Sequence, residues 1–244
     1  MEFGAVYYDR CVEILSLVAD ADSLAERTQV EPRGKLRVTA PITFGAERLA
    51  ARLGEYLSMY PAIDLEIVLT DQVVDLLGDG FDTAIRLGAL GPSRLVARRL
   101  TDYPMAICAS PDYCRQRGTP AAPQDLAAQD CLVFAYAPDS EWNATGKGWR
   151  AFDPEGEETV AVRSRVMINS AQSLRRAVVA GVGIAMLPAA LIRENIQVGR
   201  LVRLLPDYQI PSRPLHVVFH GDRYRSPKLR SFVALLSQTL GRAL

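Results

Sequence analysis

Residues 35–69, KLRVTAPITFGAERLAARLGEYLSMYPAIDLEIVL, contain the pattern that decides the fold. The apolar residues at 36–38 predict a short strand, and those at 63–69 predict a second strand. Between them the sequence predicts a helix over 44–60, which Pro61 ends. The apolar face of this helix is formed by Leu49, Leu53, Tyr56, Leu57 and Tyr60. Because a strand, a helix and a strand in succession are typical of a parallel βαβ unit, the predicted fold class is α/β.

The alternation of strands and helices continues beyond this unit. A short helix is predicted at 72–77, and strands are predicted at 82–87 and 105–109. A second run of strands and helices begins at residue 160 and ends with a helix that starts at Pro227. The sequence contains no internal repeat of fixed period. Two lobes of similar α/β character are the simplest interpretation.

Composition and charge exclude several classes of protein. The chain has 244 residues, with 28 Lys and Arg against 28 Asp and Glu. This zero net charge removes the bulk electrostatic attraction expected of a whole-chain binder of nucleic acid or anionic membranes. The small basic cluster of Arg33, Lys35 and Arg37 is interpreted as a solvated face. The longest apolar stretch, 177–192, is interrupted by glycine and proline and is shorter than the roughly 18 residues of a membrane span, so no membrane partner is predicted.

The cysteines indicate a reducing compartment. None of them belongs to a C-x-x-C pair, and in a chain of this length they form neither a disulfide framework nor a zinc site. The first ten residues, MEFGAVYYDR, lack the basic and apolar regions of a secretory signal. We therefore expect a cytoplasmic protein. The cysteines are Cys11, Cys108, Cys114 and Cys131.

The sequence offers little for catalysis. Its two histidines, His216 and His220, lie about 13 Å apart if they share a strand, too far to hold one metal ion together. The stretch Gly181-Val182-Gly183 leads into a strand and lacks the third glycine of a nucleotide-binding fingerprint, so it predicts a tight turn. Cys108 is interpreted as a small hydrophobic residue of a buried strand. We therefore expect no catalytic residue, no metal site, no cofactor and no enzyme activity.

Polar residues at strand-to-helix junctions form a better candidate site. Thr43, Gln72, Ser110 and Asn169 each stand where a helix is predicted to begin after a strand. Helix N-termini present free N–H groups, and open α/β sheets bind ligands at the carboxyl ends of their strands. Arg86, at the end of a predicted strand, could bind a carboxylate with its guanidinium. The alternative readings, ordinary N-caps and a surface or Asp-paired arginine, remain open.

The first residues predict a separate element. Residues 5–27 have the apolar spacing of an amphipathic helix, and their charge is acidic, which suits a helix pair better than DNA. The apolar face of this helix includes Tyr7, Cys11, Ile14 and Val18.

Several motifs together resemble a known family. VTAPITFG at 38–45, LEIVLTDQVVDLLGDGFDTAIRLG at 65–88, ICASPDYC at 107–114 and AGVGIAMLP at 180–188 are similar to the effector-binding region of LysR-type transcriptional regulators. The resemblance extends in order from about residue 35 to the end. Residues before it are similar to the linker helix of this family, which pairs with a second subunit.

The resemblance implies a fold like that of type 2 periplasmic binding proteins, with two Rossmann-like lobes joined by two crossover strands and preceded by an N-terminal linker helix. It places the linker at 1–34, lobe I at 35–108 plus 214–244, and lobe II at 109–213. A small effector, a carboxylate by our expectation, would bind in the interlobe cleft.

The effector contacts implied by the resemblance are the five junction residues. Thr43, Gln72 and Arg86 would come from lobe I, and Ser110 and Asn169 from lobe II. Several family members carry a hydroxyl residue where this sequence has Gln72.

The resemblance also implies partners. The linker helix face and the 44–60 helix would form a homo-oligomer, with a dimer as the expectation. DNA would be bound only through a winged helix-turn-helix, which is not present in this sequence, so we expect that this chain alone does not read DNA. A late start and a natural fragment both remain open. The alternatives are a free-standing solute-binding protein of the same fold and an enzyme on a two-lobed scaffold.

Overall fold

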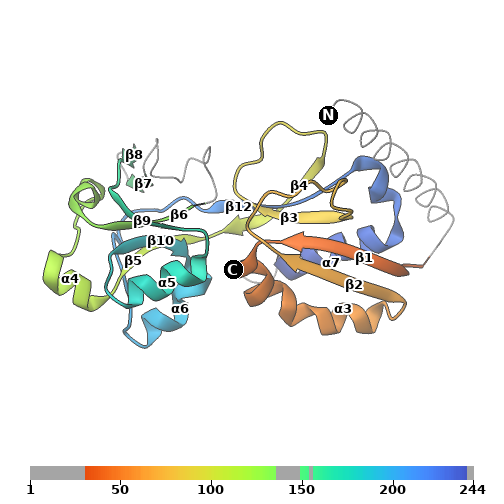
Figure 1. The fold of residues 1–244 in the computed structure, drawn as a ribbon, viewed down its shortest axis with the longest axis horizontal. Helices are drawn as coiled ribbons and strands as arrows, with labels where there is room; N and C mark the ends of the chain where they lie inside the picture. Colours follow the sequence, from red (N-terminus) through yellow and green to blue (C-terminus); the bar gives the residue numbers. More distant parts are fainter. Residues whose placement is uncertain (1–30, 136–148, 154–155, 241–244) are drawn as a thin grey trace, which may run out of the picture. The chain divides into compact units, whose positions relative to one another are not determined.

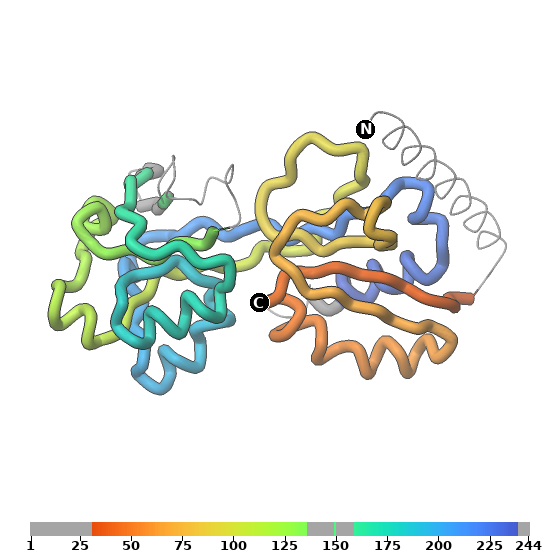
Figure 2. The backbone as a smooth tube through the Cα atoms, viewed as in Figure 1, coloured from red at the N-terminus to blue at the C-terminus, as the bar shows by residue number. Residues whose placement is uncertain are grey.

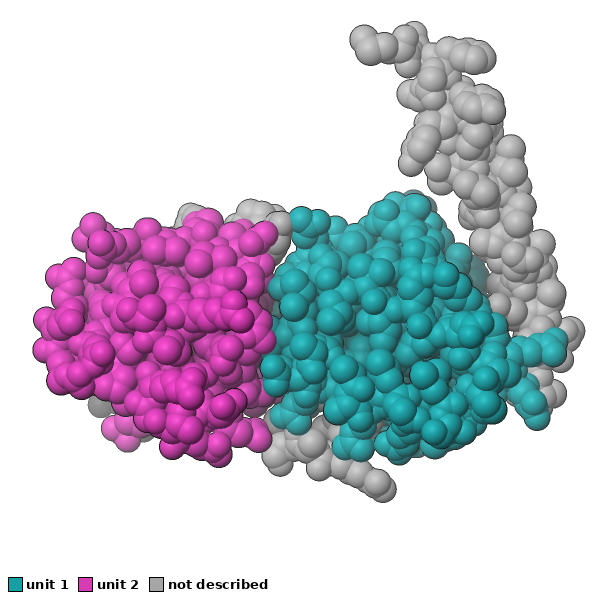
Figure 3. All heavy atoms as spheres, turned by 60° about the horizontal axis from the view of Figure 1, so that its bottom comes forward, with its two compact units in different colours: residues 1–101, 215–244 teal, residues 102–214 magenta. Residues whose placement is uncertain are grey.

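The computed structural model describes residues 31–135, 149–153 and 156–240. Two compact units divide these residues (Figure 3). Unit 1 contains the described residues up to Thr101 and those from Leu215, and unit 2 is Asp102–Pro214. The helix predicted over 5–27, with the face of Tyr7, Cys11, Ile14 and Val18, lies outside the described residues.

Unit 1 is built on a five-stranded sheet with the strand order β2-β1-β3-β12-β4 (Figure 1). β1 is parallel to both β2 and β3, and β12 is antiparallel to β3. The carboxyl ends of β1, β2 and β3 therefore lie at the same end of the sheet. The strands are β1 (Gly34–Ala40), β2 (Ile63–Leu69), β3 (Thr83–Leu87), β4 (Val96–Tyr103) and β12 (Arg213–Phe219).

The predicted first βαβ unit is present. A continuous helical run connects β1 to β2, as Figure 2 traces, and it begins two residues before the predicted start of 44. It consists of α2 (Ile42–Phe44), a π-helical turn (Gly45–Leu49), a 3-10 turn (Ala50–Arg52) and α3 (Leu53–Met59).

Tyr56 joins this run to the C-terminal helix α7 (Pro227–Leu240). Its ring lies edge-on to Phe232 with 5.6 Å between centroids, and its hydroxyl is 3.0 Å from the Ser231 Oγ. The Tyr56 side chain is fully buried. Both helices therefore pack together on one face of the sheet.

The prediction of a short helix at 72–77 is wrong. These residues form part of a loop between β2 and β3, with a turn over 76–80. The Asp75 carboxylate accepts from the Leu77 amide, and the Asp79 carboxylate accepts from the Asp75 amide. Aspartate side chains that bind nearby backbone in this way compete with helix formation. The loop instead covers the other face of the sheet, where Leu76, Phe81, Ala84 and Val218 form a buried cluster.

Unit 2 has its own five-stranded sheet, in the order β11-β5-β10-β6-β9. β10 is antiparallel to β5 and parallel to β6, which is parallel to β9. A separate antiparallel hairpin is formed by β7 (Trp149–Asp153) and β8 (Gly156–Val160). The strands of the sheet are β5 (Met105–Ala109), β6 (Cys131–Phe134), β9 (Ser164–Ile168), β10 (Ile184–Pro188) and β11 (Val202–Arg203).

Helical elements supply apolar residues to two core clusters of unit 2. One cluster joins Leu174 of α5 and Ile192 of α6 to Cys108 of β5. The other joins Tyr113 of α4 and Leu126 to Ile107 of the same strand. Because Cys108 and Ile107 are adjacent in a strand, they point to opposite faces, so the sheet is covered on both sides. The helical elements are α4 (Pro111–Arg117), a 3-10 turn (Pro123–Ala128), α5 (Ala171–Val179), α6 (Ala189–Gln197) and, in unit 1, a 3-10 turn (Gly221–Arg225).

The chain passes between the units twice, along β4 and β12, which agrees with the two crossover strands that we expected. The boundary after Thr101 differs from the lobe limit drawn at 108. The reason is the pairing of β5 with β10 and β11, which places 105–109 in the second sheet. In the described part of the chain, no helix is both long and apolar enough to span a membrane.

Candidate functional site

Three of the predicted site residues lie at the carboxyl end of the unit 1 sheet. Thr43 follows β1, Gln72 follows β2, and Arg86 lies one residue before the end of β3. The parallel register, in which Ala40 is opposite Leu69, brings these positions to the same end. Sequence order alone predicted this convergence, because the strands are parallel.

Thr43 lies inside the first helical turn, two residues beyond the capping position, which is Pro41. The helical run begins at Ile42 after Pro41, and the Thr43 side chain is only 7% exposed. A side chain on Gly45 would overlap Leu69, so glycine allows this turn to approach the end of β2 closely. The turn that holds Thr43 is thus packed directly against the end of the neighbouring strand.

An acidic side chain already lies at the start of this helical run. The Ile42 amide donates to the Asp71 Oδ1 at 3.2 Å. The first amides of a helix have no intrahelical acceptor, so the Asp71 carboxylate satisfies one of them. The expected anion site at this helix start is therefore partly filled by the protein itself.

The loop that carries Gln72 is anchored at its beginning. The Thr70 amide donates to the Ala40 carbonyl at 2.9 Å, which extends the β1–β2 pairing by one step. The Gln72 amide donates to the Thr70 Oγ1 at 3.1 Å. Gln72 itself is exposed. Its side chain is therefore accessible at the sheet end, beside a backbone that local bonds define.

Arg86 binds the same loop. Its Nη1 donates to the Gln72 carbonyl at 2.8 Å, and its Nη2 donates to the Val74 carbonyl at 3.5 Å. Burial lowers the pKa of its guanidinium. Among the residues that the structure describes, no carboxylate lies within ion-pair distance of Arg86. Arg86 is thus not paired with an aspartate among the described residues. Its half-buried positive charge is compensated by carbonyl oxygens.

Sequence reasoning missed Thr39. This β1 residue is fully buried, and its Oγ1 has no hydrogen-bond partner in the described structure. It lies opposite Ala84 of β3, two residues before Arg86. Within a predicted strand, a single threonine carries no signal that distinguishes it from an ordinary β-branched residue.

The two predicted residues of unit 2 do not lie together. Ser110 follows β5, whereas Asn169 follows β9. Because β5 runs antiparallel to β10 while β6 and β9 run parallel to it, these residues are at opposite ends of their sheet. Five strand residues separate the two ends by about 15 Å. The expectation of a shared edge therefore fails in unit 2, because it assumed that β5 is parallel to its neighbours.

Ser110 has the ordinary capping role that was left open. It is 3% exposed, and its Oγ accepts from the Tyr113 amide at 3.1 Å at the start of α4. Asn169 is exposed and lies next to Ser170, which is the residue that caps α5. Asn169 therefore keeps an accessible side chain at the end of β9.

The structural interpretations of the glycines and cysteines agree with the structure. Gly181 and Gly183 lie in the turn between α5 and β10, and a side chain on Gly183 would overlap the Asp130 carbonyl oxygen. Burial raises the pKa of the Cys108 thiol to about 12, which disfavours the reactive thiolate. In the described ranges, no group of three potential metal-binding side chains is found.

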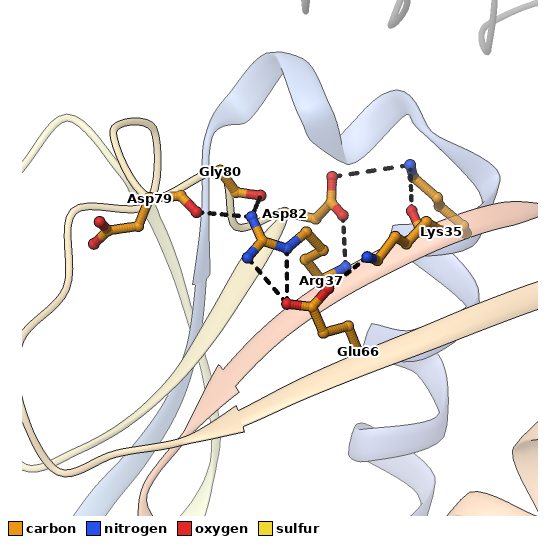
Figure 4. A network of polar contacts seen from close by, with 7 residues as sticks. Lys35, Arg37, Glu66, Asp79, Gly80 and Asp82 are labelled. Atoms are coloured by element: carbon orange, nitrogen blue, oxygen red, sulfur yellow. Dashed lines mark hydrogen bonds and ion pairs between the residues drawn. The ribbon is translucent and has the colours of Figure 1, made fainter.

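The basic cluster of the N-terminal strand is not simply solvated. Figure 4 shows the Arg37 guanidinium between β2 and the β2–β3 loop. It donates to the Glu66 Oε1 from Nε at 3.1 Å and from Nη2 at 3.0 Å, and Nη1 donates to the Asp79 and Gly80 carbonyls. Lys35 also pairs with Glu66, at 2.6 Å.

Asp82 extends the network formed by these residues. Its Oδ2 accepts from the Arg37 amide at 2.8 Å, and its Oδ1 lies 3.0 Å from the Arg223 guanidinium. The prediction of a solvated side chain fails for Arg37, because the strand register places Glu66 directly opposite it, whereas Lys35 pairs with Glu66 but stays 61% exposed.

Comparison with known proteins identifies the fold that carries these residues. Residues 29–241 match the family described as the LysR substrate binding domain. The chain is 32% identical over 234 residues to an uncharacterized HTH-type transcriptional regulator of Escherichia coli, YhjC, with 96% of this chain and 77% of the relative covered. It is 33% identical over 219 residues to the HTH-type transcriptional activator AaeR of the same organism, with coverage of 89% and 69%.

A solved structure gives the same result. CrgA, a LysR-type transcriptional regulator from Neisseria meningitidis, superposes with a TM-score of 0.72 at 28% identity, covering 99% of this chain and 80% of that one. The expected fold class is thus confirmed. The chain belongs to the family of LysR substrate-binding domains.

Proposed function

We propose that this chain is the effector-binding regulatory part of a LysR-type transcription regulator. The family match over 29–241 supports this assignment, as do relatives that are HTH-type regulators. A ligand shifts a regulator only by its differential affinity for two states. In this proposal a bound small molecule favours one conformation of the chain over another. DNA is contacted through a helix-turn-helix, the motif for which the relatives are named.

The effector contacts that we propose in unit 1 are Thr43 and Gln72, with Arg86 beside them. One observation carries the choice of ligand class: Arg86 is a half-buried cation with carbonyl acceptors and no acidic partner within the described ranges. A guanidinium so placed retains donors for a carboxylate and gains from a negative charge. We therefore propose a small carboxylate as the effector.

In unit 2 we propose Asn169 as a contact and leave Ser110 out. Asn169 is exposed at the end of β9, whereas the Ser110 hydroxyl is buried and occupied as a helix cap. The interlobe position of the site stays a prediction.

Calorimetry with benzoate tests the carboxylate site. The variant Thr43→Ala should weaken benzoate binding by about tenfold, the effect of one lost hydrogen bond to a charged group. Ser58→Ala is the matched control, because its hydroxyl lies on the same helical run, is exposed and donates to the Gly54 carbonyl. Equal affinities of Thr43→Ala and the wild type would refute the contact.

We also propose that the 44–60 helical segment takes part in self-association. Leu57 and Met59 are 38% and 57% exposed on it, and Val68 and Leu69 of the edge strand β2 are exposed as well. Large apolar side chains that stay exposed favour a protein contact. Sedimentation of Leu57→Lys should show a weaker dimer than the wild type, and a wild-type monomer at micromolar concentration would contradict the proposal.

A further inference from the structure

The loop from Thr70 to Asp75 is attached to two other elements, once through its own side chain and once through its backbone. Asp71 binds the Ile42 amide at the start of the helical run, as described above. Further along the loop, Arg86 of β3 binds the carbonyls of Gln72 and Val74. The two acceptors are two residues apart, so one planar guanidinium spans the middle of the loop.

This attachment fixes which way the loop side chains face. Val73, between the two acceptors, is 91% exposed, whereas Val74 is partly buried against the cluster that contains Leu76 and Phe81. The carbonyls turn inward to Arg86 and the Val73 side chain turns outward. Gln72, the proposed effector contact, is exposed beside it.

The bond from Arg86 Nη1 to the Gln72 carbonyl, at 2.8 Å, is of a strong kind, and the longer bond from Nη2 to the Val74 carbonyl, at 3.5 Å, adds a second point of attachment. A charged donor gives hydrogen bonds about twice as strong as neutral ones, and a guanidinium offers two parallel donors from a rigid plane. A lysine ammonium in the same place is a point charge and does not reproduce the fork. Loss of the two guanidinium bonds, which we call the fork, therefore frees the loop even where a positive charge is kept. The charge by itself does not hold the loop.

We propose that Arg86 is a positioning residue that holds the Gln72–Val74 backbone in the conformation that binds the effector. This inference rests on the proposed function of the same site, and it adds a role that does not depend on the charge of the ligand. Arg86 then contributes in two separable ways. Its charge favours a carboxylate over a neutral analogue, and its fork raises the affinity for both.

Two ligands and two variants separate these contributions. Benzoate and benzamide have nearly the same shape, but only benzoate is charged. We measure both by calorimetry against the full chain, Arg86→Ala and Arg86→Lys, with Arg52→Ala as the control. Arg52 is an exposed arginine of the same unit that pairs with Glu55.

Arg86→Ala should weaken benzamide binding by about tenfold and benzoate binding by more. Arg86→Lys should show the same loss for benzamide while retaining the wild-type preference for benzoate. Unchanged benzamide affinity in both variants would overturn the positioning role. If only benzoate binding falls, Arg86 acts by charge alone, and the proposed function stands without this inference.

Hydrogen exchange supplies a measurement that needs no ligand. In the free Arg86→Lys variant, the amides of 73–75 should exchange faster than in the wild type, while those of β1 keep their rates. Unchanged exchange at 73–75 would overturn the inference even if neither compound binds. Absence of binding by both compounds to the wild type, together with faster exchange, would refute the carboxylate proposal and support the positioning of the loop.

Discussion

The two ends of the unit 1 sheet satisfy their polar groups in different ways. In the amino-terminal half, Arg37 and Lys35 share Glu66, and Asp82 accepts from the Arg37 amide (Figure 4). Asp82 also pairs with the Arg223 guanidinium. Oppositely charged side chains pair in this half, and the strand register places Glu66 opposite Arg37.

At the carboxyl end, the side chains bind backbone without such ion pairs among the described residues. Arg86 donates to two loop carbonyls, and Asp71 accepts from a helix amide. Thr39 keeps a buried hydroxyl without a partner in the described structure. A region whose charges are compensated by side chains gains stability and has little capacity left for a ligand. At the carboxyl end, the Arg86 guanidinium is bonded to carbonyl oxygens and to no carboxylate of the described residues, so it keeps the capacity to bind an anion.

Loss of Arg37 should have the largest effect on stability. Arg37→Met removes the guanidinium that lies over the Phe81 ring, together with its bonds to Glu66 and to the Asp79 and Gly80 carbonyls. We expect the free energy of unfolding in urea to fall by about 2 kcal/mol, the value for bonds to a charged group. The matched control Arg115→Met, which removes an exposed pair with Asp112, should cost less than about 1 kcal/mol. An equal loss of unfolding free energy in both variants would contradict a larger contribution of the Arg37 network to stability.

Two threonines of the same sheet should respond in opposite directions to the same change. The Thr83 hydroxyl donates to the Val218 carbonyl at 3.0 Å, whereas the equally buried Thr39 hydroxyl has no partner in the described part of the chain. Thr83→Val should lower the free energy of unfolding by about 1 kcal/mol, and Thr39→Val should leave it unchanged or raise it by up to about 1 kcal/mol. Loss of stability in Thr39→Val similar to that of Thr83→Val would mean that both hydroxyls are satisfied.

The pH dependence of stability should reveal the Glu66 pair. Hydrogen bonds from Arg37, and then Lys35, lower the pKa of Glu66 from 4.5 to about 2. A lowered pKa stabilises the folded state above pH 4.5, and this contribution is lost as the pH falls to about 2. The difference in melting temperature between the wild type and Glu66→Gln should therefore be constant above pH 5 or so and shrink below that value. A difference that does not change down to pH 2 would contradict the assignment.

The comparison with Glu66→Gln is needed because other carboxylates titrate in the same range. Two arginines, Arg165 and then Arg117, bind the buried Asp130 of unit 2 and lower its pKa. The wild-type curve alone therefore combines several groups.

The sequence predicted the layers and the positions of residues that depend on parallel strands. Apolar spacing located β1, the helical run and β2, and their parallel order placed Thr43, Gln72 and Arg86 at one end. It also predicted Pro227 as the start of the last helix. These predictions succeed because the spacing of apolar residues and the residues that begin or end a helix can be read directly from the sequence.

The failures concern strand direction and side-chain competition. Whether β5 runs with or against β10 is decided by long-range pairing, so Ser110 was grouped with Asn169 although the two are at opposite ends. The helix at 72–77 failed because aspartate carboxylates bind the loop backbone. Strand register also cannot be predicted from the local sequence, and it is the register of β1 and β2 that places Glu66 opposite Arg37.

A benzoate titration of the ¹⁵N-labelled chain, followed by NMR, tests most directly whether the carboxyl end of the unit 1 sheet is the ligand-binding end. Thr43 and Gln72 should show the largest amide shift changes in unit 1, and Lys35, Arg37 and Glu66 should stay unchanged. Shift changes centred on the Arg37 network, or none at Thr43 and Gln72 at saturating benzoate, would contradict the account.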